Sequence, residues 1–162
     1  MGQRSRGLAD RAYLDGLRLL SRRELSEAQV RTRLARKAYD PGDIEDAVAR
    51  LRTEGALDDA RTASAIARTG VALKRFGPRR VRRDIEAAGI APDLAAAAVE
   101  AVFDGADPAA TLDDELTRRL GATDEPIDDR TAARLYRRLV AHGHDPELVS
   151  RAIRSRRRAA RQ

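Results

Sequence analysis

A run of basic residues marks the place where side chains are best suited to bind an anionic partner. Residues 74–83 read KRFGPRRVRR and contain six cations and no acid. If Val81 and Ile85 face a helical core, Arg79 and Arg83 become outward neighbours of like charge, which costs a helix about 0.2–0.5 kcal/mol. A binding role is therefore favoured, with a solvated helix face as the alternative. The candidate contact residues are Lys74, Arg75, Arg79, Arg80, Arg82 and Arg83.

A second basic region precedes the first and is diluted by Glu27. A binding role and a solvated surface are equally open for it. Its candidate contact residues are Arg22, Arg23, Arg31, Arg33, Arg36 and Lys37. A third basic cluster occupies residues 151–161, where a frayed, solvated terminus and an accessory electrostatic contact are both open.

Residue types that perform catalysis are scarce in this sequence. There is no Cys, which excludes disulfides, thiolate nucleophiles and Cys-based metal sites. Neither of the glycine-rich phosphate-binding motifs G-x-x-x-x-G-K-[ST] and G-x-G-x-x-G occurs. The two histidines, His142 and His144, fall in a turn, where we expect them to be exposed rather than to hold a metal that needs three or four ligands. The sequence predicts a protein with no enzymatic activity and no cofactor.

The sequence offers few aromatic side chains on which nucleic-acid bases could stack. Phe76 is the only aromatic residue inside the basic run, and it suits a core or helix-end contact better. Binding to single- or double-stranded DNA should therefore depend on backbone phosphates and on salt. Residues 104–129 oppose such binding with a net charge of −7. A solvated linker is favoured for this acidic segment; repulsion of DNA and contact with a basic protein surface are the alternatives.

Composition indicates helices. The chain has 162 residues, a net charge of +6, 42% apolar residues and only five aromatic residues. A core must therefore be built from Leu, Ile, Val and Ala, which favours helices over a β-sandwich. No apolar run approaches the length of a membrane span and the first residues lack the apolar region of a secretory signal. We expect a cytoplasmic protein.

An internal repeat appears when the sequence is aligned on Pro41, Pro92 and Pro146. Apolar residues recur eleven and seven positions before each proline, and six and seven positions after it. This spacing predicts one helix before a turn and a second helix that begins at the proline, whose missing N–H costs nothing in the first turn. The turn residues three positions before the prolines are Ala38, Gly89 and Gly143.

One further helical stretch precedes each block, so the sequence predicts an all-α protein of nine helices in three tandem three-helix repeats. The expected repeats are residues 1–56, 57–105 and 106–162, the last with a basic C-terminal tail. Units of about 50 residues are marginal alone and should pack on one another in an elongated array. One compact nine-helix bundle is the alternative. Residues 121–127 form the expected flexible linker.

Three segments resemble the RecX family of regulatory proteins, in order and in spacing. Residues 23–34 read RELSEAQVRTRL, residues 54–61 read EGALDDAR, and residues 77–85 read GPRRVRRDI, followed by Gly89 and Ile90. The resemblance runs through nearly the whole chain, although the third repeat matches only in pattern. Thr62 stands where the family commonly has an aromatic residue, so packing of the fourth helix should differ.

The resemblance implies a curved, elongated array of three-helix units without catalysis. It implies a monomer that binds the filament of RecA recombinase on single-stranded DNA, that suppresses the ATPase, strand-exchange and coprotease activities of RecA, and that also binds DNA. The arginines of residues 79–83 fall in the family's most recognisable motif and are the first candidates for contact. A stand-alone DNA-binding or architectural protein is the alternative, and a helical scaffold for another protein is a third possibility.

Overall fold

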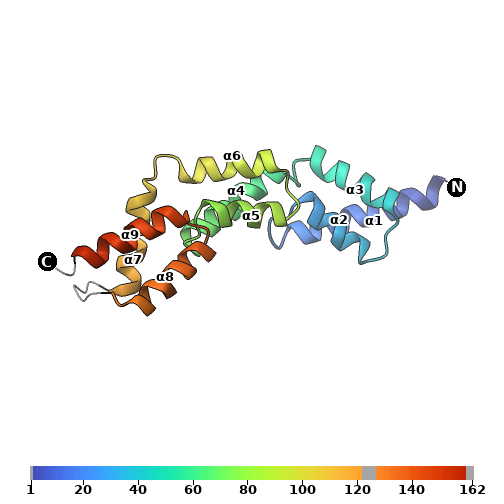
Figure 1. Cartoon of the computed structure of the whole chain (residues 1–162). Helices are drawn as coiled ribbons and strands as arrows, with labels where there is room; N and C mark the ends of the chain where they lie inside the picture. Colours follow the sequence, from blue (N-terminus) through green and yellow to red (C-terminus); the bar gives the residue numbers. More distant parts are fainter. Residues whose placement is uncertain (1, 122–126, 160–162) are drawn as a thin grey trace. The chain divides into compact units, whose positions relative to one another are not determined.

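The structure is a computed structural model that describes residues 2–121 and 127–159. Within these residues it contains nine α-helices and no strand (Figure 1). The predicted all-α fold with nine helices is confirmed. The helices are α1 Gly2–Leu20, α2 Glu27–Ala35, α3 Pro41–Thr53, α4 Asp59–Ala72, α5 Pro78–Ala87, α6 Pro92–Phe103, α7 Pro108–Leu120, α8 Asp129–Ala141 and α9 Pro146–Ala159.

The first three helices pack around one apolar cluster. Helix α1 packs on α3 and α2, and α2 packs on α3. The stripe predicted for α3 is buried, because its apolar residues recur every three or four positions and share one face. Burial of a Leu, Ile or Val side chain stabilises the fold by about 1.5–3 kcal/mol. The buried residues of this cluster are Ala12, Leu25, Val30, Leu34, Ile44, Ala47, Val48, Leu51 and Leu57.

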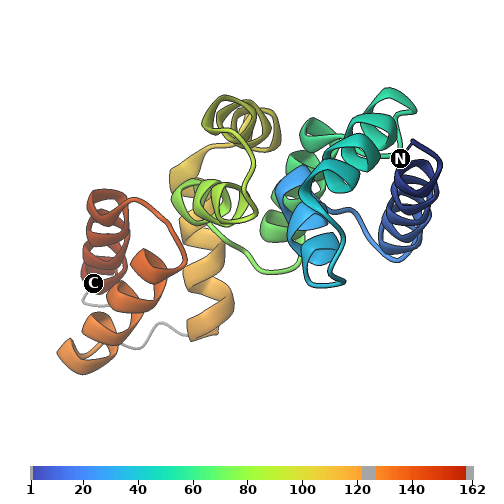
Figure 2. The same cartoon turned by 90° about the vertical axis from the view of Figure 1, so that its right-hand side faces the viewer.

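The last three helices enclose a separate apolar cluster. Helix α9 packs on both α7 and α8, and Figures 1 and 2 show the three together. Most of the cluster lies at helical spacing on α7, α8 and α9, and Ile127 closes it from the segment before α8. Its buried residues are Leu112, Leu116, Ile127, Ala132, Leu135, Leu139, Val149 and Ile153.

The described helices belong to two compact units. One unit comprises residues 1–66 and 84–98, and the other comprises residues 67–83 and 99–162. Helices α4, α5 and α6 therefore each contribute residues to both units. The division into repeats at residues 56 and 105 stays a prediction.

Helix starts follow the sequence signals in most places. Ser26 caps α2 by accepting a hydrogen bond from the Gln29 N–H at 3.1 Å, as the S-x-x-Q spacing predicts. Pro41, Pro92 and Pro146 are each the first residue of their helix. Asp40 precedes α3, but its carboxylate makes no capping bond.

A hydrogen bond to a turn carbonyl occurs twice, at equivalent places in the repeat, once from a side chain and once from the backbone. Within the first unit, the Ser26 hydroxyl, 15 residues before its proline, donates to the carbonyl of Ala88, four residues before the next proline. Within the second unit, the Gly77 N–H, also 15 residues before its proline, donates to the carbonyl of His142 at 2.8 Å, and His142 is again four residues before a proline. We call this arrangement the turn contact. It docks the start of one helix on the helix–helix turn of the following repeat.

Glycine is required where the turn contact forms. Gly89 and Gly143 have φ of 80° and 88°, a backbone conformation that favours Gly. A Cβ on Gly89 would overlap the Ala28 side chain, and a Cβ on Gly143 would overlap the backbone of Arg80. The equivalent residue of the first repeat is Ala38, with φ of 61°.

Candidate partner interface

Helix α5 carries the basic face that the sequence predicts. Val81 and Ile85 are buried, at 1% and 0% exposure, which turns the residues between them outward. Arg79, Arg82 and Arg83 are exposed. Helix α5 therefore presents cations on its outer side, in the arrangement that the spacing indicates.

The fold brings an acid from a distant turn to the start of this basic run. The Arg79 guanidinium forms an ion pair with the Asp145 carboxylate at 2.5 Å, from the α8–α9 turn. Asp145 also accepts from the backbone N–H groups of Leu148 and Glu147, and these bonds, the one from Leu148 first, together with Arg79, hold its pKa below the usual range. The basic run contains no acid of its own, but Asp145 pairs with Arg79 from a distant part of the chain. The positive charge that α5 presents outward is therefore smaller than the sequence suggests.

Phe76 does not offer a free stacking face. The Arg80 guanidinium lies 4.9 Å and the Lys74 ammonium 5.6 Å from the centre of its ring, as cation–π contacts. The edge-on ring of His142 lies 5.4 Å from the Phe76 centroid, at 88°. Phe76 is thus a helix-end contact, as the sequence favours, and it holds two of the predicted basic residues against the protein.

Two of the basic residues predicted around α2 are engaged in ion pairs within the first unit. The Arg31 guanidinium pairs with Glu45 at 2.9 Å and with Glu27 at 3.0 Å, which raises its pKa, Glu45 having the larger effect. The Lys37 ammonium pairs with Asp15 at 2.7 Å. Because they are paired, these two residues are less available to an outside anion.

A smaller basic cluster remains in the first unit. Arg33 is half-buried and donates to the Gln29 carbonyl at 3.0 Å. Burial lowers its pKa, and the nearby positive charges of Arg23 and Arg36 lower it further. Arg22, Arg23 and Arg36 are exposed. This cluster is the α2 counterpart of the α5 face.

The histidine turn differs from the expectation of an exposed pair. His144 is 7% exposed and His142 is half-buried. Burial lowers the pKa of both imidazoles, and Arg119 and Arg138 lower that of His142 further. The expectation was wrong because the turn contact with Gly77 covers this turn, a long-range event without a local sequence signal.

The acidic segment is partly structural. Glu115 is 4% exposed and accepts from Arg118 at 2.5 Å and from Arg119 at 2.6 Å. Burial alone would raise the pKa of Glu115, but the two guanidinium groups outweigh burial and lower it. Asp107 and Asp128 cap α7 and α8. The linker predicted at residues 121–127 lies mostly outside the described residues.

The basic C-terminal segment is helical as far as Ala159, where description ends. The Arg156 guanidinium pairs with Asp113 of α7 at 3.0 Å, and Arg157 pairs with Asp129 of α8 at 2.6 Å. These pairs tie α9 to both α7 and α8, which gives part of the basic C-terminal segment an intramolecular role.

Other kinds of site were sought in the same residues. Among the described residues, no three His, Cys, Asp or Glu side chains are grouped so that they could hold a metal ion. None of the described helices is both long and apolar enough to cross a bilayer. Two adjoining hollows in the second unit, which the sequence did not indicate, are described below.

The arrangement of helices and its charged faces can be compared with known proteins. The fold is that of solved RecX structures: the chain superposes on RecX from Lactobacillus salivarius with a TM-score of 0.72 and 16% identity, over 92% of this chain and 96% of that one. A second crystal structure, of a regulatory protein RecX, gives a TM-score of 0.70 and 18% identity, over 90% of this chain and 71% of that one.

Sequence comparison identifies the family. Residues 12–51 match the first three-helix domain of RecX and residues 58–99 match the second. Regulatory protein RecX of Syntrophotalea carbinolica is 35% identical over 133 residues, which cover 82% of this chain and 87% of that protein. The same protein of Halorhodospira halophila is 32% identical over 149 residues, or 90% of this chain and 89% of that one. The chain belongs to the RecX family.

The departure at Thr62 has a physical account. The side chain is buried, at 1% exposure, and its hydroxyl donates to the carbonyls of Asp58 at 2.9 Å and Leu25 at 3.3 Å. These hydrogen bonds satisfy a polar group that would otherwise be costly to bury.

Proposed function

We propose that this protein binds the RecA filament on single-stranded DNA and inhibits its ATPase, strand-exchange and coprotease activities. It acts in the cytoplasm, as a monomer and by binding alone, without catalysis of its own. The proposal rests on membership of the RecX family, whose named members are regulatory proteins. The observation that carries it at residue level is the exposed basic face of α5.

The α5 face is suited to an acidic protein surface or a phosphate backbone. Arg82 and Arg83 are exposed; Arg83 lies on the side of the helix opposite the buried Val81 and Ile85, and Arg82 lies on its flank. A guanidinium fork binds a carboxylate or a phosphate through two parallel hydrogen bonds. A second basic cluster, Arg22, Arg23, Arg33 and Arg36, provides another contact of the same kind. Several weak contacts on one chain raise avidity.

The direct test measures the DNA-dependent ATPase of RecA while this protein is titrated below the RecA concentration. We expect loss of ATP hydrolysis at substoichiometric ratios, and no hydrolysis by the protein alone. Retention of full RecA activity at an excess of the protein would contradict the proposal.

A charge-reversal pair then tests the α5 face. Arg82→Glu with Arg83→Glu should raise the concentration for half-inhibition by about tenfold or more, because attraction becomes repulsion at two positions. Arg79 is left unchanged because it pairs with Asp145. The matched control is Arg134→Glu with Arg137→Glu, which makes the same charge change on exposed positions of α8. Equal effects of the two pairs, with helicity preserved in both, would remove the α5 face from the mechanism.

A stand-alone DNA-binding protein is the second candidate, favoured by the net charge of +6 and by the exposed arginines. It predicts tight binding to duplex DNA without RecA and no effect on RecA hydrolysis. The ATPase titration therefore separates the two functions.

A further inference from the structure

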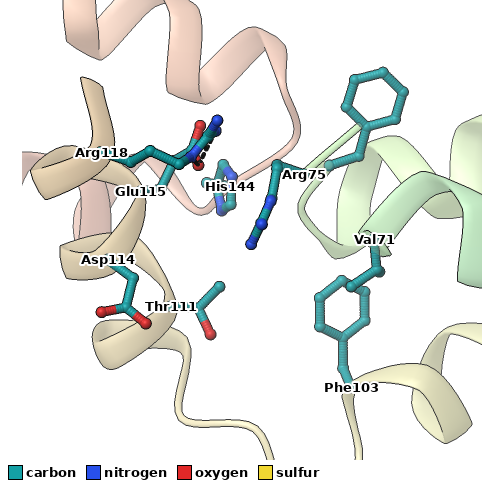
Figure 3. Close-up of a pocket in the computed structure, with 9 residues that line it drawn as sticks. Val71, Arg75, Phe103, Thr111, Asp114, Glu115, Arg118 and His144 are labelled. Carbon is teal, nitrogen blue, oxygen red and sulfur yellow. Dashed lines mark hydrogen bonds and ion pairs between the residues drawn. The ribbon is translucent and has the colours of Figure 1, made fainter. Parts of the chain in front are cut away.

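Two adjoining hollows lie in the second unit, and one of them is bordered by Pro78 and Arg79 at the start of α5. The first has a volume of about 270 Å³ and is open to solvent, between α7 on one side and the ends of α4 and α6 on the other (Figure 3). The second has a volume of about 320 Å³ and a mostly apolar lining that includes Pro78, Leu112 and Leu148. Phe103, Thr111 and His144 line both, so a compartment that includes charged residues adjoins a mostly apolar one.

Arg75 occupies a backbone position that ordinarily selects glycine. Its φ is 54°, and it follows α4 as the left-handed residue of a helix-ending turn. The turn is closed by hydrogen bonds from the Arg75 N–H to the Val71 carbonyl at 3.3 Å and from the Phe76 N–H to the Gly70 carbonyl at 2.9 Å. A side chain with a Cβ is strained there, and such strain often marks a functional position.

The Arg75 side chain extends into the first hollow. In Figure 3 its guanidinium lies in the open space between Thr111 on one wall and Val71 and Phe103 on the other. In the part of the chain that the structure describes, this guanidinium has no ion-pair or hydrogen-bond partner. Glu115 on the opposite wall is already neutralised by Arg118 and Arg119, at 2.5 and 2.6 Å. Asp114 also lines the hollow, but among the described residues no ion pair joins it to Arg75, so the Arg75 guanidinium is left without a partner.

His144 lines both hollows and keeps one unsatisfied nitrogen buried behind them. The residue is 7% exposed, and its Nε2 is buried without a hydrogen-bond partner among the described residues. The imidazole also forms a hydrogen bond with the Arg75 backbone, and that bond favours the protonated ring, so the ring donates to the carbonyl. Nδ1 is therefore the donor, and Nε2 is left as an acceptor that lacks a donor.

We propose that these hollows bind a short segment of a partner protein in which a carboxylate adjoins an apolar side chain. Arg75 takes the carboxylate, and the apolar side chain enters the compartment of Pro78, Leu112 and Leu148. Charge complementarity commits the site to this chemistry, because Arg75 is unmatched and the adjoining compartment is apolar. The inference stands without the proposed function, since neither Arg82 nor Arg83 lines the hollows.

The probe is N-acetyl-L-phenylalanine, which carries a carboxylate, an amide N–H and an apolar ring. Titrated into the full-length, ¹⁵N-labelled protein, it should give saturable shifts at Arg75, Phe76, Phe103, Thr111 and His144. The neutral N-acetyl-L-phenylalaninamide should bind about tenfold or more weakly, because a hydrogen bond to a charged group is lost. Equal affinity for acid and amide, or no saturable shift at these residues, would overturn the proposal.

Arg75→Gly separates binding from folding. Gly adopts the left-handed conformation without strain, so the thermal midpoint should not fall, while affinity for the probe should drop by about tenfold or more. Arg137→Gln removes the same charge from an exposed position of α8 and should leave affinity unchanged. Unchanged affinity in Arg75→Gly, or an equal loss in Arg137→Gln, would overturn the proposal.

Discussion

His142 and His144 are the only histidines in the sequence, and burial lowers the pKa of both. In the unfolded chain each imidazole titrates near its ordinary value of about 6.5. Just below that pH the unfolded state binds more protons than the folded state does. The free energy of unfolding must therefore fall as the pH drops through 6.5, and it must continue to fall until the folded imidazoles are protonated.

At the residue scale we predict that, below pH 6.5, the free energy of unfolding falls by at most about 1.4 kcal/mol per pH unit for each histidine. Urea unfolding at several pH values between 5.5 and 7.5 measures it. The variant His142→Gln with His144→Gln should have a flatter profile, whatever its absolute stability. A profile equally steep in parent and variant would show that other groups cause the pH dependence.

At the element scale, the turn contact between α5 and the α8–α9 turn is the feature most sensitive to a single methyl group. Gly143→Ala should destabilise the protein by about 1–2 kcal/mol from the positive φ alone. It should cost more from overlap with the Arg80 backbone, which cannot move without displacing α5. Thermal or urea unfolding measures the sum.

Gly55→Ala is the matched control for that prediction. Gly55 has φ of 70° after α3, and a Cβ there would meet nothing within 4 Å. It therefore reports the strain alone. If Gly143→Ala were no more destabilising than Gly55→Ala, the turn contact would not be held by close approach of the backbones.

Element positions follow from local signals, and contacts between elements do not. Spacing of Ile44, Val48 and Leu51 and the prolines at helix starts identifies α3 and its buried face, because helical periodicity and proline chemistry are local. The pairing of Arg79 with Asp145 joins residues 66 positions apart. Helical periodicity in the sequence carries no information about a contact between residues so far apart in the chain. The outward direction of Arg82 and Arg83 was predictable, because the helical spacing that identifies the buried residues also identifies the exposed ones.

The left-handed conformation of Arg75 shows another limit. Glycine after a helix indicates this conformation in a sequence, but arginine does not. The left-handed turn after α4 could therefore not be predicted from the sequence. The burial of His144 likewise depends on a distant glycine, Gly77. The sequence identifies the basic run as cationic. Which of its residues lie on the outward face of α5 and which extend into a hollow could be seen only in the folded structure.

At the scale of the whole molecule, the net charge of +6 predicts salt-dependent binding to single-stranded DNA. The logarithm of the affinity should fall linearly with the logarithm of salt concentration, by about 0.7 for each phosphate contacted. Arg23→Gln should reduce that slope by about 0.7 and weaken binding equally on oligo-dT and on mixed sequences. Fluorescence anisotropy between 50 and 300 mM salt measures both quantities. An effect confined to one DNA sequence would indicate base recognition instead.

Ala38 sets the turn of the first repeat apart from the two that follow it. Its backbone has the same left-handed conformation as Gly89 and Gly143, yet it carries the methyl group that would overlap a docked helix at either of those positions. A further repeat could not dock on the first by the same turn contact without Ala38→Gly. Lengthening such a protein by duplication at that turn would therefore require this substitution before any change to its core.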